Sequence, residues 1–232
     1  MVIGGLQKNS FIDYPGKISC VVFLSGCNFS CPYCHNPDLV RNGKDKRLVI
    51  DEESVLSFLE KRRGFLDGVV ISGGEPTLNP DLIFFCKKIQ KLGYPIKLDT
   101  NGSRPDVIRA FIDEGLPDYI AMDVKTDPLL YSPFIQKECN PDRILDSIRL
   151  IMESDLDYEF RTTCLTPFVD EKIVTIISRI IEGAKLYALQ RFCNTRILDP
   201  GFCTDTCRKI NDRELIRFQS IASKYVMKCI IR

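Results

Sequence analysis

Three cysteines, Cys27, Cys31 and Cys34, stand close together in the spacing C-x3-C-x2-C. Thiolates are soft ligands that bind iron–sulfur clusters. A four-iron cluster held by three cysteines keeps one iron open to a ligand from outside the protein, whereas an electron carrier normally fills that place with a fourth cysteine. The spacing therefore indicates an iron–sulfur cluster that acts on a bound molecule.

A zinc site is the alternative for this loop. Cys31 and Cys34 have the C-x2-C spacing of half a zinc knuckle, and His35 could add a nitrogen ligand. A structural zinc site needs a second pair of ligands, however, and a non-catalytic cluster needs a fourth cysteine nearby. The nearest other cysteine, Cys20, lies inside an apolar run. We therefore favour a cluster with one open iron.

A second segment, Ser72-Gly73-Gly74-Glu75-Pro76-Thr77, also ends an apolar run. The two glycines would let a backbone approach a ligand closely, and the carboxylate of Glu75 could bind a cationic amine. Gly-Gly and Glu-Pro are equally frequent in ordinary turns. The position of the segment, one helical stretch and one apolar run after the three cysteines, favours the binding interpretation.

Two later apolar runs also end in polar residues, at Asp99-Thr100-Asn101-Gly102 and at Asp123-Val124-Lys125. The first has the composition of a strand-ending turn, and the second could be a solvated strand end. A fifth run contains Arg161, which could simply pair with a neighbouring acid. Both interpretations stay open for these residues.

The elements that must position these groups follow from the hydrophobic pattern. Apolar runs alternate with amphipathic segments six times. The predicted strands are 18–24, 68–72, 96–99, 119–124, 157–163 and 185–191. The predicted helices are 52–63, 80–92, 105–114, 141–153, 171–181 and 212–224, two of which begin at an Asn-Pro pair that is typical of a helix start.

This alternation predicts the α/β class with a parallel sheet and right-handed crossovers. Six strand–helix units are too few to close an eight-fold barrel, so we expect an open partial (β/α)6 TIM-like barrel. Ligands of such folds bind at the carboxyl ends of the strands, where the polar motifs fall. We expect one domain over residues 1–232, with a core at about 17–191 and a C-terminal extension at 192–232.

The composition excludes several classes of partner. The 232 residues carry a net charge of +1, so the chain has no broad basic field for nucleic acid. No apolar run reaches the roughly 18–20 residues of a membrane span, and the segment Met1 to Ser10 does not have the pattern of a signal peptide. We expect a cytoplasmic protein with reduced thiols and with neither nucleic acid nor membrane as a partner.

The chain has 11 cysteines, and three of them, Cys193, Cys203 and Cys207, form a second, looser group. This group could be a coincidence, an auxiliary metal or redox site, or a relay for a hydrogen atom, and the sequence does not choose between these. The scattered cysteines are expected to be small buried apolar residues: Cys20, Cys86, Cys139, Cys164 and Cys229.

The cysteine loop and the segment Ser72–Pro76 together resemble the radical S-adenosylmethionine (SAM) superfamily. The resemblance implies a radical SAM fold with a [4Fe–4S] cluster on Cys27, Cys31 and Cys34. It also implies that the amine and carboxylate of SAM chelate the open iron. The reduced cluster would then cleave SAM to methionine and a 5′-deoxyadenosyl radical.

Further segments are similar to the glycyl-radical-enzyme activases: Gly4–Gln7, Phe11–Lys17 and the whole loop Phe23–Asp38. The similarity is strongest from Gly4 to about Thr166. It implies that the radical removes a hydrogen atom from a glycine of a partner glycyl radical enzyme, with flavodoxin or ferredoxin as electron donor. The alternative is a radical SAM enzyme that acts on another peptide or on a small molecule.

The resemblance also assigns site residues. It implies contacts with the cofactor for Tyr33, His35, Gly73, Gly74, Glu75, Asp99, Asn101, Asp123, Lys125 and Arg161. Lys125 would face the SAM carboxylate, and Asp99, Thr100 and Asp123 would hold a monovalent cation. The chain lacks the later histidine of pyruvate formate-lyase activases, which favours the branch that activates anaerobic ribonucleotide reductases, or an uncharacterised branch. Another residue, such as Gln190 or Phe192, would then cover the adenosine.

Overall fold

The computed structural model describes residues 1–40, 49–131, 140–193, 195–205 and 207–232, with the backbone alone for 203–205. Eight strands follow one another through one sheet in chain order, from β1 to β8. Strand β1 pairs with β2 in the antiparallel sense, and the other described registers, for β2–β3, β3–β4, β6–β7 and β7–β8, are parallel. The predicted parallel α/β sheet is thus confirmed.

The strands and helices lie along the chain as follows. The strands are β1 (Ile3–Ser10), β2 (Ser19–Leu24), β3 (Gly68–Gly73), β4 (Ile96–Thr100), β5 (Tyr119–Asp123), β6 (Asp157–Cys164), β7 (Tyr187–Arg191) and β8 (Cys229–Ile231). The helices are α1 (Pro37–Val40), α2 (Glu52–Lys61), α3 (Leu82–Lys91), α4 (Pro105–Asp113), α5 (Pro141–Glu153), α6 (Glu171–Ile180), α7 (Pro200–Asp205) and α8 (Asp212–Ala222), with the short 3-10 turns η2 (Pro76–Leu78) and η3 (Pro128–Leu130).

The contacts within the chain divide it into two compact units. Unit 1 contains residues 1–28, 36–100 and 106–120, and unit 2 contains residues 29–35, 101–105 and 121–232. The expected single domain over 1–232 stays a prediction. Among the described residues, no helix has both the length and the apolar character needed to cross a membrane.

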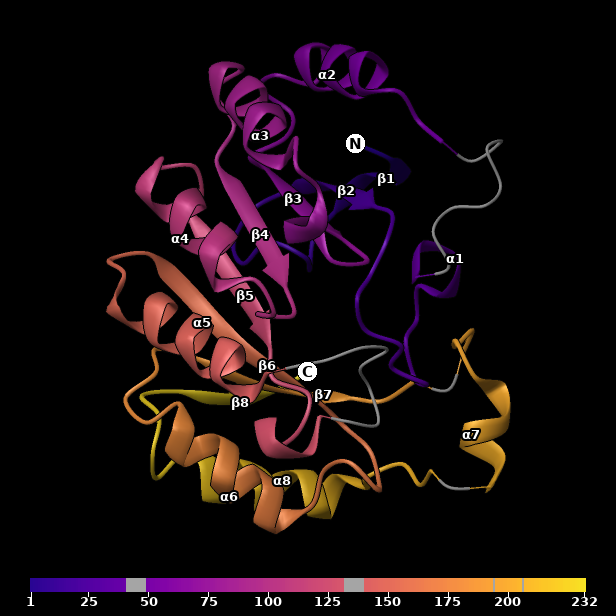
Figure 1. Ribbon diagram of the computed structural model, residues 1–232, viewed down its shortest axis with the longest axis vertical. Coiled ribbons are helices and arrows are strands. Elements are labelled where there is room, and N and C mark those ends of the chain that lie inside the picture. The colour runs from indigo at the N-terminus through magenta and orange to yellow at the C-terminus, as the bar shows by residue number, and fades with distance from the viewer. Residues whose placement is uncertain (41–48, 132–139, 194, 206) are drawn as a thin grey trace. The chain divides into compact units, whose positions relative to one another are not determined.

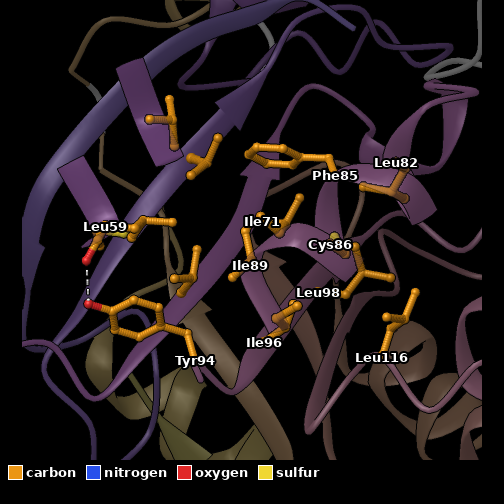
Figure 2. Packing of buried hydrophobic residues seen from close by; sticks show 14 of the residues in the cluster. Leu59, Ile71, Leu82, Phe85, Cys86, Ile89, Tyr94, Ile96, Leu98 and Leu116 are labelled. Atoms are coloured by element: carbon orange, nitrogen blue, oxygen red, sulfur yellow. Dashed lines mark hydrogen bonds between the residues drawn. The ribbon is translucent and has the colours of Figure 1, made fainter. Parts of the chain in front are cut away.

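The core of unit 1 lies between its parallel strands and the helices α2 and α3 (Figure 1). Val22, Ile71 and Leu98 face this core from three neighbouring strands, in register with one another. Figure 2 shows the core from close by, including the hydroxyl of Tyr94, which donates to the carbonyl of Leu59 at 2.7 Å. Each fully buried aliphatic side chain stabilises the unit by about 1.5–3 kcal/mol.

In unit 2, helices α6 and α8 run alongside each other next to strands β7 and β8 (Figure 1). Helix α8 begins with a capping box, in which Asn211 accepts from the Glu214 backbone and the Glu214 side chain accepts from the Asn211 backbone. The two hydrogen bonds of the capping box define where α8 starts. Leu215 and Phe218 are among the buried residues of this helix.

All six predicted strands and all six predicted helices are present, with ends that shift by a few residues. The prediction missed β1, β8, α1 and α7. Strand β1 carries two glycines and the exposed residues Gln7 and Lys8 in eight positions, so it has no apolar run. Four of the five scattered cysteines are buried as expected, and Cys139 lies outside the described residues.

Candidate functional site

The three-cysteine loop begins directly after β2 and is tied to the end of β3 by backbone hydrogen bonds within unit 1. The Gly74 N–H donates to the carbonyl of Leu24, and the Glu75 N–H donates to the carbonyl of Gly26, both at 2.8 Å. Cys27, the next residue, is half-buried. The two predicted motifs are therefore brought together, and the start of the cysteine loop is held by the backbone of the Gly-Gly segment.

The glycines of this segment are required by that close approach. A Cβ atom on Gly74 would lie 2.1 Å from the carbonyl oxygen of Gly26. Gly73 has a φ of +121°, and a Cβ there would lie 2.4 Å from the carbonyl oxygen of Leu24. The structure shows that these glycines admit the backbone of the cysteine loop, and their expected contact with a ligand stays a prediction.

Glu75 is fully buried and caps the turn η2. Its Oε1 accepts hydrogen bonds from the Thr77 backbone at 3.1 Å and from the hydroxyls of Thr77 at 2.5 Å and Thr100 at 2.8 Å. A buried carboxylate with these donors is well satisfied. Glu75 thus fixes the turn after Gly74, and its contact with a cationic amine stays a prediction.

Asp99 is the penultimate residue of β4 and lies on the face opposite the apolar core of unit 1. The Ser72 hydroxyl donates to Asp99 Oδ2 at 3.0 Å, and the ammonium of Lys97 forms an ion pair with Asp99 Oδ1. Only 1% of the Lys97 side chain is exposed, and its Nζ lies 5.9 Å from the centroid of the Tyr119 ring. The sequence analysis missed Lys97, although a lysine inside an apolar strand signals a buried partner.

Asn101 follows β4 and belongs to unit 2. It is buried, and its side-chain oxygen accepts from the Ser103 backbone at 2.9 Å. Gly102 has a φ of +74°. These are the features of the turn interpretation of this segment, and the contact of Asn101 with the cofactor stays a prediction.

The remaining cysteines of the loop, Cys31 and Cys34, lie in unit 2 around a turn in which the Cys34 N–H donates to the carbonyl of Cys31 at 2.9 Å. Cys31 is buried and Cys34 half-buried. Burial raises the pKa of the Cys31 thiol to about 11, although the positive charge of Lys125 acts in the opposite direction. A metal ligand must lose its proton, so the nearby ammonium favours the state of Cys31 that binds iron.

Tyr33, between these cysteines, is buried in a row of aromatic rings. Its ring centroid lies 5.7 Å from that of Phe168, in the connection after β6. Phe168 in turn stacks on Phe202 of α7, with centroids 5.3 Å apart and an angle of 14° between the rings. Such contacts hold the cysteine turn in one position relative to two segments far along the chain.

Asp123, Lys125 and Arg161 form a charged cluster in unit 2. Asp123 Oδ2 lies 2.8 Å from Lys125 Nζ, and Asp123 Oδ1 lies 2.7 Å from Arg161 Nε. Burial alone would raise the pKa of the Asp123 carboxyl, but the charges of Arg161 and Lys125 lower it well below its ordinary value. For Lys125, the carboxylate outweighs burial and raises the pKa of the ammonium well above its ordinary range.

The segment after β7 also reaches the cysteine turn, which the sequence did not predict. The Asp199 N–H donates to the carbonyl of Pro32 at 2.9 Å. His35, which is exposed, lies 3.4 Å from the Thr195 hydroxyl through Nδ1, and its ring centroid lies 5.9 Å from that of Phe192. Phe192 therefore lies beside the cysteine turn, and its proposed cover of an adenosine stays a prediction.

The second cysteine group is only partly described. Cys193 is exposed and Cys207 is half-buried, while the side chain of Cys203 lies outside the described residues. The auxiliary site on these three residues stays a prediction.

The donor set of the first loop fits an iron–sulfur cluster. Cys27, Cys31 and Cys34 offer three soft thiol ligands within one short stretch of sequence, and the chain adds a buried ammonium, Lys125, whose charge acts on Cys31. The polar residues Ser72, Asp99 and Asp123 lie within the last two positions of β3, β4 and β5, at the carboxyl ends where ligands of such sheets bind.

A parallel α/β sheet with a three-cysteine loop after its first parallel strand defines an iron–sulfur protein that keeps one iron open to a substrate. Residues 21–180 match the model of the Radical SAM superfamily, and the chain belongs to that superfamily. It is a radical SAM enzyme, and its cofactors are a [4Fe–4S] cluster and S-adenosylmethionine.

Relatives extend the comparison. The chain is 36% identical over 238 residues to a protein of Methanocaldococcus jannaschii that is named, provisionally, a glycyl-radical enzyme activating enzyme, and the match covers 100% of this chain and 95% of the relative. It is 32% identical over 142 residues to the 7-carboxy-7-deazaguanine synthase of Haemophilus influenzae, with 61% of this chain and 57% of that protein covered.

Among solved structures, the chain resembles Streptococcus suis SuiB bound to S-adenosylmethionine, with a TM-score of 0.67 at 12% identity. The match covers 91% of this chain and 51% of SuiB, so the chain spans about half the length of that protein. This likeness shows the radical SAM fold.

Proposed function

We propose that the protein is a glycyl-radical-enzyme activase whose substrate is one backbone glycine of a partner protein. The match that carries the proposal is the 36% identity to the M. jannaschii protein, because it spans the whole chain and includes the segment after β7 that contacts the cysteine turn. The resemblance of the cysteine loop to activases of anaerobic ribonucleotide reductases supports the same assignment.

In this proposal Cys27, Cys31 and Cys34 hold the cluster. When bound, the reduced cluster supplies one electron to S-adenosylmethionine, which yields methionine and a 5′-deoxyadenosyl radical that takes one hydrogen atom from the glycine. The chain's own residues position these groups. Lys125 stabilises the thiolate form of Cys31, and the hydrogen bonds from Gly74 and Glu75 to the loop backbone hold its start.

Lys125 is also the residue that we assign to the SAM carboxylate. It is held in place by Asp123, and its backbone N–H donates to the hydroxyl of the buried Tyr131 at 2.8 Å. The ion pair fixes the ammonium and the backbone hydrogen bond fixes the segment that carries it, which favours a preorganised position for binding an anion. We further propose flavodoxin or ferredoxin as the source of the electron.

The direct experiment labels the glycine. The anaerobically reconstituted, reduced protein would be mixed with SAM and a candidate glycyl radical enzyme that carries deuterium on its glycine Cα. We expect a glycyl radical by electron paramagnetic resonance and one deuterium in 5′-deoxyadenosine by mass spectrometry. A partner with alanine in place of the glycine is the matched control and should give neither signal.

A small-molecule substrate is the second candidate function, because a synthase of 7-carboxy-7-deazaguanine is 32% identical over 142 residues. Formation of unlabelled 5′-deoxyadenosine with every candidate partner, together with consumption of a small molecule, would favour this function over the activase. Deuterium transfer from the glycine would exclude it.

A further inference from the structure

Asp99, assigned by resemblance to a monovalent cation, has both carboxylate oxygens engaged by the chain itself. Oδ1 forms an ion pair with the Lys97 ammonium, and Oδ2 accepts from the Ser72 hydroxyl at 3.0 Å. The side chain of Asp99 is 14% exposed and that of Lys97 is 1% exposed. A metal cation at Asp99 would compete with an ammonium that is almost entirely buried and already paired with this carboxylate.

The arrangement follows from the strand geometry. Residues two apart on a strand project to the same face, so Lys97 and Asp99 share one face of β4, while Ile96 and Leu98 belong to the apolar core. Lys97 therefore extends along its own strand to Asp99. A buried ammonium is tolerated when it is paired and further surrounded by favourable groups, here Asp99 and the Tyr119 ring.

The other two residues assigned to the cation also have partners, each within its own unit. The hydroxyl of Thr100 is buried and donates to Glu75 at 2.8 Å. In unit 2, Lys125 Nζ and Arg161 Nε lie against the two oxygens of Asp123. Both carboxylates are thus already paired with cationic side chains of the chain itself, which counts against the monovalent cation that the sequence suggested.

We propose that Lys97 is a positioning residue whose ammonium provides, on a tethered side chain, the positive charge that a monovalent cation would provide at Asp99. This inference depends on the proposed function in one respect, namely that Asp99 belongs to the cofactor site. A tethered ammonium is present in every molecule at any salt composition. The chain is therefore independent of Na⁺ and K⁺, and replacing Lys97 by a neutral residue creates a dependence on them.

The first test is binding of Na⁺ to the full-length, cluster-containing protein, followed by 23Na nuclear magnetic resonance at constant ionic strength set with tetramethylammonium chloride. Wild type should show no saturable binding. Lys97→Met should bind Na⁺ saturably, and Lys97→Met with Asp99→Asn should lose that binding again. Saturable binding by wild type that Asp99→Asn abolishes would overturn the proposal, and this comparison holds even where Lys97→Met fails to fold.

The second test is rescue of SAM cleavage. Wild type should form 5′-deoxyadenosine at rates within about twofold in Na⁺, K⁺ and tetramethylammonium. Lys97→Met should fall about tenfold in tetramethylammonium, through misplacement of Asp99, and recover in Na⁺ or K⁺, whereas Lys97→Arg should need no rescue. Lys88→Met, at an exposed lysine paired with Glu52, is the matched control and should behave as wild type.

A merely structural role for Lys97 predicts a loss that no cation restores, and that result would overturn the proposal. Absence of SAM cleavage in wild type would count against the proposed function instead, while the binding of Na⁺ would still decide the role of Lys97.

Discussion

Asp123 is the carboxylate that pairs with two basic side chains of unit 2, both of which are mostly buried. Lys125 and Arg161 have side chains that are 14% and 13% exposed, and each contacts one carboxylate oxygen. Removing one partner of a buried ion pair leaves an uncompensated buried charge. The resulting loss of folding stability is larger than the net stability that the intact pair contributes.

We therefore expect Asp123→Asn to lower the free energy of unfolding at pH 7 by about 3 kcal/mol, at the low end of the range for buried pairs because the Asp123 side chain is 26% exposed. Because the folded pKa of this carboxyl is lowered, its contribution is present above the unfolded pKa of about 3.9 and is lost as the pH falls. The difference between variant and wild type should shrink below about pH 4 in urea titrations.

Asp157→Asn is the control for that measurement. Asp157 begins β6, is 79% exposed and lies 3.8 Å from Lys185, so its replacement should change the unfolding free energy by less than about 0.5 kcal/mol. A loss that is equal for Asp123 and Asp157, or one that does not depend on pH, would show that the charged cluster does not stabilise unit 2 in this way.

Some residue chemistry was predictable from sequence where charged residues stood at the end of a strand. Asp123-Val124-Lys125 is an example, since two charges at i and i+2 share one face of a strand. Lys97 and Asp99 have the same spacing. The sequence of Asp99 and the residues after it is typical of a turn, however, so the pairing of Asp99 with the lysine before it was not predicted. The partner of a buried charge becomes evident only when the strand is known to be buried on both faces.

At the scale of elements, the cysteine loop is held by the turn after β3 rather than by its own sequence. The two backbone hydrogen bonds that Leu24 and Gly26 accept are possible only because Gly74 has no side chain. Backbone atoms cannot move aside as a flexible side chain can, so an added methyl group must displace the loop that carries Cys27.

Gly74→Ala should therefore lower the unfolding free energy by about 1–3 kcal/mol through overpacking and should reduce the iron bound after anaerobic reconstitution. Gly5→Ala in β1 is the matched control, because a Cβ there would make an ordinary contact of 3.5 Å with the Phe23 side chain. Iron and sulfide analysis with urea unfolding measures both effects. Full iron binding by Gly74→Ala would contradict the proposed support of the loop.

The elements that the sequence did not predict are those defined by distant contacts. Strand β1 exists because it pairs with β2, and three-residue β8 because it pairs with β7. The contact of Asp199 with Pro32 joins segments more than 160 residues apart, which periodicity cannot indicate. The six strand–helix repeats were predictable because each carries its pattern locally.

At the scale of the whole molecule, the match of residues 21–180 to the Radical SAM superfamily and the chain's own three-cysteine loop lead to the same chemistry. The end-to-end identity with a relative named as an activating enzyme adds a proposal for its substrate. The polar residues at the ends of successive strands are the ones that the sequence resemblance assigns to the cofactors, and buried partners position several of them.

The most direct measurement of this account is formation of 5′-deoxyadenosine from SAM by the anaerobically reconstituted and reduced protein, alone and with a candidate glycyl radical enzyme. Cys31→Ala would be run beside it, with Cys86→Ala in helix α3 as a control for loss of a buried thiol. We predict 5′-deoxyadenosine from wild type and Cys86→Ala and none from Cys31→Ala. Absence of product from wild type with a verified four-iron cluster, with and without the partner, would contradict the account.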